Sequence, residues 1–219
     1  MTQANDSILV TPGSGATVAT HNPGDAKEYQ VVMLADDKGH IHGTKPSYML
    51  FAPTQAVGAS KLFFDLFNAA GSGKIIEING IWAVVKTDVA IAGVVGVELQ
   101  VARTSAVGTA GTAATYNGTV FTAATITPKD TGNAALPAQI TARLTPTGGA
   151  TVAGVWWQNY IFTEETNVSS QVSQFFNLVP AQTTEFQSLT LREGQGVVVR
   201  QGTIAGLGSL GFLVDFTAF

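Results

Sequence analysis

The sequence predicts an all-β chain: an antiparallel β-sandwich of jelly-roll type, preceded by an extended N-terminal arm. Three observations lead to this prediction. Thr, Val, Ile, Phe and Gly dominate, and they form runs in which apolar and polar residues alternate. Gly, Pro, Asn and Asp interrupt these runs at short intervals, as they do between strands. The chain has no cysteine, so burial without disulfides must hold its core.

The chain is predicted to divide into two parts. Residues 1–58 are expected to form the arm with a small β-hairpin, because residues 1–25 are polar and rich in Gly, Thr, Asn and Pro. Residues 59–219 are expected to form one jelly-roll-like sandwich, since 219 residues is the length of a single sandwich with an extension.

Alternation and turn residues place the individual strands. The predicted strands are Glu28–Ala35, Lys61–Phe67, Lys74–Lys86, Val94–Arg103, Thr119–Ile126, Gln139–Leu144, Gly154–Thr163, Gln174–Leu178, Phe186–Leu191, Gly196–Gly202 and Ser209–Phe216. The glycine-rich turn 68–73 is a hairpin candidate. The last two strands are expected to pair across Thr203–Gly208. In Ser209–Phe216, every second residue from Leu210 onward is apolar, so these side chains share one face of the strand. Ala56–Phe67 could form a short helix, but Gly58 and the Phe63-Phe64 pair favour a strand to about the same degree.

Charge is scarce in this chain. Only 12% of the residues are charged and the net charge is −4, against about 25% charged in average globular domains. No basic stripe is present to neutralise phosphates, which argues against nucleic-acid binding. The most apolar window, residues 75–97, is interrupted by charged and amide side chains, so no membrane span is expected. A surface this poor in charge predicts that other protein covers part of it.

No catalytic, cofactor or metal site is expected. Gly71-Ser-Gly-Lys74 lacks the earlier glycine and the following Ser or Thr of a phosphate loop, which favours a plain turn. His40 and His42 share a face in an extended segment, but two ligands do not make a zinc site, and an exposed turn is favoured. No Gly-x-Ser-x-Gly elbow accompanies the histidines. The chain is therefore predicted not to be an enzyme.

Aromatic side chains are the strongest candidates for a recognition surface. Alternation sends Trp156 and Tyr160 to one face of their strand and Trp157 to the other, so one tryptophan should be in the core. The other is either a subunit-interface anchor or a platform for sugar stacking, and the interface is preferred because no convergent acidic and amide groups can be placed from the sequence. The predicted interface residues are Trp156, Trp157, Tyr160, Phe212, Phe216 and Phe219.

Three stretches, in this order along the chain, carry a resemblance to tailed-bacteriophage virion proteins. Gly15–Thr20 (GATVAT), Glu28–Ala35 (EYQVVMLA) and Asp37–Gly39 resemble the opening "GATVAT…hyQrVkLa…dG" of such proteins. Leu62–Ile78 (LFFDLFNAAGSGKIIEI) resembles their "lfnpaGSGk…i.i" stretch, and Leu189–Gln201 (LTLREGQGVVVRQ) their "i.L.pGeGlaVrq" strand. The chain departs from the pattern at Asn22–Asp25, and at Val32 and Met33, where a basic residue is usual.

The resemblance implies a non-enzymatic structural subunit of a phage particle, located in the virion and assembled in the host cytoplasm. Its partners would be further copies of itself, in a trimer or another cyclic oligomer, and other virion proteins such as the major capsid protein. No nucleic acid, membrane or cofactor is expected to bind. A decoration or head-associated role is favoured over a tail component. The alternative is a tail or fibre component that acts as a carbohydrate- or receptor-binding module.

Overall fold

A computed structural model describes residues 45–87, 95–119, 123–148, 150–163, 172–179 and 188–219, together with the backbone of four short strands before residue 45. The chain divides into the units Met1–Thr44 and Lys45–Phe219. In the first unit, β1 (Ile8–Val10) pairs antiparallel with β2 (Ala16–Val18), and β3 (Thr20–His21) with β4 (Tyr29–Gln30). The predicted strand Glu28–Ala35 coincides with β4 at Tyr29 and Gln30, and the rest of it lies outside the described residues.

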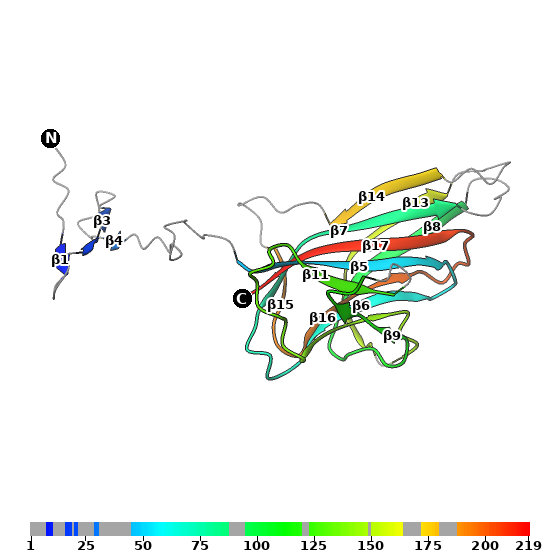
Figure 1. The fold of residues 1–219 in the computed structure, drawn as a ribbon. Helices are drawn as coiled ribbons and strands as arrows, with labels where there is room; N and C mark the ends of the chain where they lie inside the picture. The colour runs from blue at the N-terminus through cyan, green and yellow to red at the C-terminus, as the bar shows by residue number, and fades with distance from the viewer. Residues whose placement is uncertain are drawn as a thin grey trace. The chain divides into compact units, whose positions relative to one another are not determined.

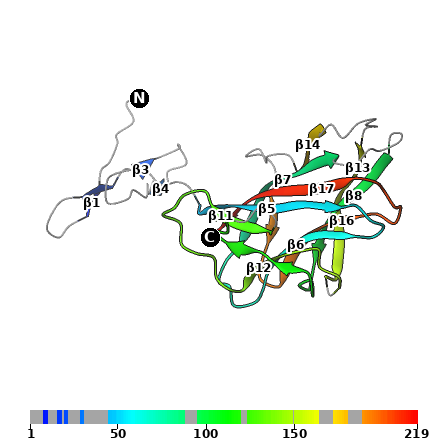
Figure 2. The same cartoon turned by 45° about the vertical axis from the view of Figure 1, so that its right-hand side comes forward.

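The second unit is made of strands in two layers (Figures 1 and 2). The first sheet has the order β10-β11-β5-β17-β7-β14, with β15 also paired to β7. Its strands are β5 (Ser47–Ala56), β7 (Ile76–Thr87), β10 (Thr115–Tyr116), β11 (Thr125–Pro128), β14 (Val172–Val179), β15 (Leu189–Leu191) and β17 (Ser209–Ala218).

The second sheet has the order β13-β8-β16-β6-β12-β9. Its strands are β6 (Leu62–Asn68), β8 (Val95–Thr104), β9 (Thr112–Ala113), β12 (Ile140–Leu144), β13 (Val152–Thr163) and β16 (Gln195–Gln201). All pairings recorded between strands are antiparallel except that of β10 with β11. No helix occurs in the described residues. The prediction of an all-β chain with antiparallel sheets is confirmed.

The core lies between the two sheets, and both sheets contribute to one cluster of buried apolar side chains. Phe63 and Phe64 of β6 meet Phe212 of β17 across the gap, with ring centroids 5.1 and 5.6 Å apart. Along β17, every second residue from Leu210 to Phe216 is buried, so the apolar face of this strand is its inner face. This interdigitation of aromatic rings joins the two layers at their centre.

Two predicted pairings are wrong. The last two strands do not pair across Thr203–Gly208, because β16 lies in the second sheet and β17 in the first. The turn 68–73 is not a hairpin either, because it leads from β6 in the second sheet to β7 in the first. In both cases the loop crosses from one layer to the other. A glycine-rich loop between two apolar runs has the same sequence signature whether the runs pair or face each other across a core.

β5 was not predicted, and it places residues 47–56 in the sandwich instead of in the arm, where the sequence predicted them. The strand lies between β11 and β17, well inside the first sheet. Pro53 concealed it, because proline cannot donate to a ladder and is confined to edges and bulges. Here the register between β5 and β17 shifts between the pairs Leu210–Gln55 and Phe212–Ala52, so Pro53 lies at a bulge.

The segment between β8 and β13 adds strands to both sheets. β11 pairs with β5 in the first sheet, and β12 pairs with β6 in the second. Gly108, in the loop that follows β8, donates its backbone N–H to the buried carboxylate of Asp65 on β6 at 2.6 Å. Part of the outer face of the second sheet is thereby covered. β13, β8 and the C-terminal half of β16 carry the partly exposed side chains described next.

Candidate functional site

Of the six predicted interface residues, the structure places two in the core and three at the surface, and leaves Trp157 partly buried. Phe212 and Phe216 are 1% and 0% exposed and belong to the core of the sandwich. Their assignment to an interface is therefore wrong: they lie on the inner face of a strand that has a neighbour on each side. Trp156, Tyr160 and Phe219 are 39%, 50% and 37% exposed, so these side chains are open to a partner or ligand.

Alternation along β13 is confirmed for the two tryptophans. Trp157 is partly buried and packs against the core, and Ile161 on the same face is buried. Trp156 and Tyr160 are exposed. The register with β8 shifts between Val155 and Trp157, which marks a β-bulge or a similar irregularity next to Trp156.

A row of polar side chains continues from β13 across the outer face of the second sheet. The register places Gln158 opposite Gln100 of β8, and Gln100 opposite Arg200 of β16. Gln100 Nε2 donates to Oε1 of Glu98 at 2.9 Å and to Oε1 of Gln158 at 3.2 Å, while Arg200 Nε donates to Gln100 Oε1 at 2.7 Å. The four side chains of this polar row therefore hold one another in place on three adjacent strands.

A cavity of about 300 Å³ lies at the β16 side of this row. Its lining residues are Ser60, Leu62, Glu98, Gln100, Arg200, Gln201, Gly202 and Thr203. Gly202 lets the Glu98 carboxylate lie close to the backbone, because a Cβ at this position would come within 2.2 Å of it and force the side chain to move. The cavity thus exposes carboxylate, amide, guanidinium and hydroxyl groups together. Such a combination can hydrogen-bond a ligand that both donates and accepts.

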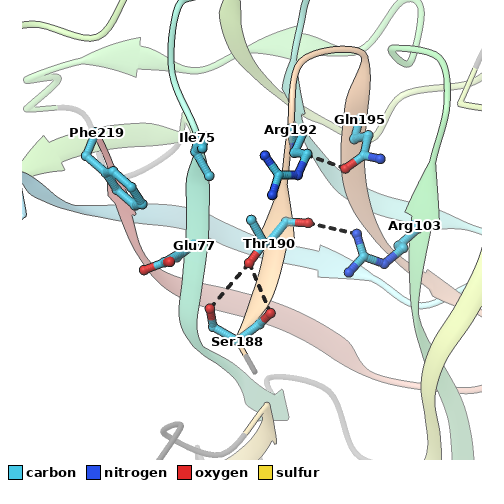
Figure 3. A pocket seen from close by; sticks show the side chains of 8 residues that line it. All are labelled: Ile75, Glu77, Arg103, Ser188, Thr190, Arg192, Gln195 and Phe219. Carbon is cyan, nitrogen blue, oxygen red and sulfur yellow. Dashed lines mark hydrogen bonds between the residues drawn. The ribbon is translucent and has the colours of Figure 1, made fainter. Parts of the chain in front are cut away.

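A larger cavity, of about 550 Å³, lies where β7 and β15 of the first sheet approach β8 and β16 of the second (Figure 3). Its lining residues are Ile75, Glu77, Arg103, Ser188, Thr190, Arg192, Gln195 and Phe219. Figure 3 shows Thr190 in the middle, with Glu77 on one side and Arg103 on the other. Phe219, predicted as an interface residue, forms one wall, and Lys45 Nζ lies 3.7 Å from its ring centroid.

The charges of this larger cavity are partly neutralised within the protein. Glu77 forms an ion pair with Lys45 at 2.7 Å. Arg103 Nη1 donates to the backbone oxygen of Thr190 at 2.8 Å, so it caps the outer side of the short strand β15. The backbone N–H of Arg192 donates to Gln195 Oε1 at 2.9 Å, as Figure 3 shows. The two guanidinium groups give the cavity hydrogen-bond donors suited to an anionic group.

The turn Gly71-Ser-Gly-Lys74 holds an anion that the protein supplies itself. The Glu193 carboxylate accepts the backbone N–H of Gly73 at 2.7 Å and that of Gly71 at 3.2 Å. Both glycines have positive φ, which turns their N–H groups toward the same side. These bonds hold the pKa of Glu193 below its usual range, with the Gly73 N–H as the largest cause. This favours a structural turn over a phosphate-binding loop, because the Glu193 carboxylate already binds the N–H groups of Gly71 and Gly73.

We expect Glu193→Gln to lower the melting temperature at neutral pH, because the neutral amide binds the two N–H groups more weakly than the carboxylate does. A carboxyl group with a lowered folded-state pKa stabilises the fold above its unfolded pKa, and this contribution is lost as pH falls through the folded pKa. Thermal unfolding of both proteins should therefore show a difference at neutral pH that closes in acid. An equal difference at every pH would contradict the role of the Glu193 charge.

Metal-binding and membrane-spanning features can be sought only in the described residues. His40 and His42 lie outside them. Within the part of the chain that the structure describes, no three His, Cys, Asp or Glu side chains gather as metal ligands would. Among those same residues, no helix has the length and apolar character needed to cross a membrane. Comparison with family models, curated proteins and solved structures found no match to this chain.

Sequence reasoning missed the polar row. Glu98 and Gln100 each sit between apolar neighbours in a strand, which is the ordinary pattern of an outer face, and Arg200 follows a run of three valines. Their convergence depends on β8 lying between β13 and β16, which come from distant parts of the chain. The alternation of Glu98 and Gln100 with apolar residues was the available signal, but strand order was needed to bring them together with Arg200 and Gln158.

Proposed function

We propose that the protein is a non-enzymatic structural subunit of a tailed-bacteriophage particle, which associates with copies of itself and docks on the capsid or a head-associated structure. One observation carries the proposal: β13 is an edge strand of twelve residues without a charged side chain. Soluble proteins usually protect such an edge with charges, proline or short length, because its backbone groups can pair with another chain.

The strand order supports a jelly-roll topology for the sandwich. The eight main strands in chain order are β5, β6, β7, β8, β13, β14, β16 and β17. The first sheet contains β5, β17, β7 and β14 side by side, which are the first, eighth, third and sixth of these strands. The second sheet contains β6, β16, β8 and β13, which are the second, seventh, fourth and fifth. Each sheet thus alternates early and late strands, as two interleaved Greek keys do. Viral capsid proteins are among the proteins built on jelly rolls.

The contacts between two of the motifs support the resemblance to virion proteins. Leu62–Ile78 and Leu189–Gln201 are far apart in sequence, but β6 of the first pairs with β16 of the second. In addition, Glu193 of the second motif binds the glycine turn of the first. Shared structural contacts give a reason for the two motifs to occur together. A location in the virion, with other virion proteins such as the major capsid protein as partners, follows from this resemblance.

The experiment is the molar mass of the full chain by light scattering, compared with that of Val155→Lys. Val155 is an exposed residue of β13, and a charge at this edge should block pairing with another chain. We expect the unaltered protein to be a closed oligomer, such as a trimer, and Val155→Lys to shift toward the monomer.

Leu207→Lys serves as the matched control, because Leu207 is also an exposed apolar residue but lies in the loop between β16 and β17. Its mass should equal that of the unaltered protein. A monomer at every concentration for all three proteins would contradict self-association. Equal losses from both lysine variants would contradict the role of the β13 edge.

The alternative of a different class is a tail or fibre component that binds carbohydrate. The mixture of exposed aromatic and polar side chains around Gln100 favours it. Backbone pairing at the β13 edge and ligand binding on the outer face of the sheet use different groups, so one virion subunit can do both.

A further inference from the structure

Two exposed aromatic rings flank the polar row on the outer face of the second sheet. Tyr160 lies opposite Glu98 in the ladder between β13 and β8, and Gln158 lies opposite Gln100. Trp156 lies two residues before Gln158 on the same strand, and the rings of Trp156 and Tyr160 are both substantially exposed. The outer face therefore presents aromatic side chains on β13 beside amide, carboxylate and guanidinium groups on β8 and β16.

The polar row is preorganised around Gln100. Its amide hydrogens go to Glu98 and Gln158, and its oxygen accepts from Arg200. These bonds fix the orientation of the Gln158 amide, so that its nitrogen is left as a donor. They also use one Glu98 oxygen and the Arg200 Nε, which leaves the second carboxylate oxygen and the terminal guanidinium nitrogens. Preorganised donors and acceptors lose little conformational entropy when a ligand binds.

We propose that this face is a binding site for neutral saccharides, in which pyranose rings stack on Trp156 and Tyr160 and hydroxyl groups bind the polar row. A hydroxyl group both donates and accepts, which matches a surface that offers amide and guanidinium donors beside carboxylate and amide acceptors. The apolar C–H face of a sugar ring matches an exposed aromatic face. The adjacent cavity of about 300 Å³ is at the lower end of the range for small-molecule sites.

The charges of the site favour neutral saccharides as its ligands. Glu98 and Arg200 line the same cavity and carry opposite charges, so the site has no net charge of its own. An anionic sugar would meet the Glu98 carboxylate as well as Arg200. The same residues disfavour a second copy of the chain as occupant of this face, because the centres of subunit interfaces are depleted in charged side chains.

The test is binding of maltotriose, cellotriose and xylotriose to the full chain, followed by calorimetry and by tryptophan fluorescence. We expect at least one of them to bind and to change the fluorescence. Trp156→Ala and Gln158→Ala should each weaken that binding about tenfold, which is the effect of about 1.4 kcal/mol lost from one stacking or hydrogen-bonding contact. Sialyllactose, an anionic sugar, should bind no more tightly than the neutral ligands.

Asn159→Ala is the matched control, because Asn159 is the neighbouring exposed amide on β13 and falls on the alternate position of the strand. It should leave saccharide affinity unchanged. The proposal is overturned if none of the three neutral sugars binds, or if all three variants bind them equally. It is also overturned if Trp156→Ala dissociates an oligomer that Val155→Lys leaves intact, since a second copy would then cover the face. Light scattering reports self-association separately, so either proposal can fail without the other.

Discussion

Replacing Phe212 with alanine should lower the free energy of unfolding by about 3–5 kcal/mol, the range measured for aromatic residues in protein cores. Phe212 is 1% exposed on β17, which lies between β5 and β7. Its ring contacts Phe63 and Phe64 of the opposite sheet. Removing it leaves a cavity between the two layers, and strands with neighbours on both sides cannot move in to fill it. Unfolding in guanidinium chloride, followed by circular dichroism, measures the loss.

Phe219→Ala is the control for this measurement. The same side chain is removed, but Phe219 is 37% exposed and lies outside the core cluster. Its substitution should cost less, roughly 1–2 kcal/mol, because the ring is only partly buried and its removal opens no cavity in the core. Equal losses of unfolding free energy at positions 212 and 219 would show that Phe212→Ala does not destabilise the protein by opening a cavity between the sheets.

Asp65→Ala should lower the free energy of unfolding by about 1–3 kcal/mol, the usual cost of leaving a buried donor unsatisfied. The carboxylate of Asp65 is 1% exposed and accepts the Gly108 N–H at 2.6 Å. Arg143 lies directly opposite Asp65 in the ladder between β6 and β12. Alanine removes the acceptor for Gly108 and the charge that faces Arg143, so the loop after β8 should detach from the sheet. Hydrogen exchange of the Gly108 amide, which should become faster, is the second measurement.

The pH dependence separates the hydrogen bond of Asp65 from its charge. Burial raises the pKa of Asp65, against the opposing effects of the Gly108 N–H and of Arg143. A carboxyl group with a raised folded-state pKa binds more protons in the folded than in the unfolded protein between its two pKa values. Its contribution to stability therefore increases as pH falls through the folded pKa toward about 3.9, the ordinary value for Asp. Asp65→Asn keeps an acceptor but cannot titrate.

The unaltered protein should accordingly gain stability relative to Asp65→Asn as the pH is lowered across this range. Denaturant unfolding of both proteins at several pH values gives the difference directly, and effects of other carboxyl groups cancel. A difference that is independent of pH, or that changes in the opposite direction, would show that Asp65 is not a desolvated acid in the folded protein.

Most strands of the sandwich were predictable from local patterns. Lys61–Phe67, Lys74–Lys86, Val94–Arg103, Gln139–Leu144, Gly154–Thr163 and Gln174–Leu178 each correspond to an observed strand within a few residues. Alternation also grouped the apolar residues of β17 on one face and separated Trp156 from Trp157, because successive side chains of a strand point to opposite faces. β5 was missed because Pro53 breaks the ordinary strand signal, and only the bulge opposite β17 accommodates it.

The candidate site was predictable only in part. The sequence pointed to Trp156, Trp157 and Tyr160 without deciding which tryptophan is exposed. The structure shows that Trp156 and Tyr160 are exposed and that Trp157 packs against the core. The sequence also pointed to Phe212 and Phe216, where aromatic character alone could not distinguish an interface from a core. Glu98, Gln100 and Arg200 were not predicted. Nothing in their local sequence distinguishes a polar residue that converges with others from one that simply faces solvent.

The amino-acid sequence by itself determined that the chain is all-β, where most strands lie, and which side chains share a face of a strand, because these properties depend on neighbours along the chain. Only the tertiary structure decided which strands are paired, that the loops 68–73 and 203–208 cross between layers, and that Gln100 joins Gln158 to Arg200. Strand pairing depends on contacts between distant segments, and a turn that reverses within a sheet has the same residues as one that crosses the core. The polar row around Gln100 therefore arises from the order of the strands in the sheet.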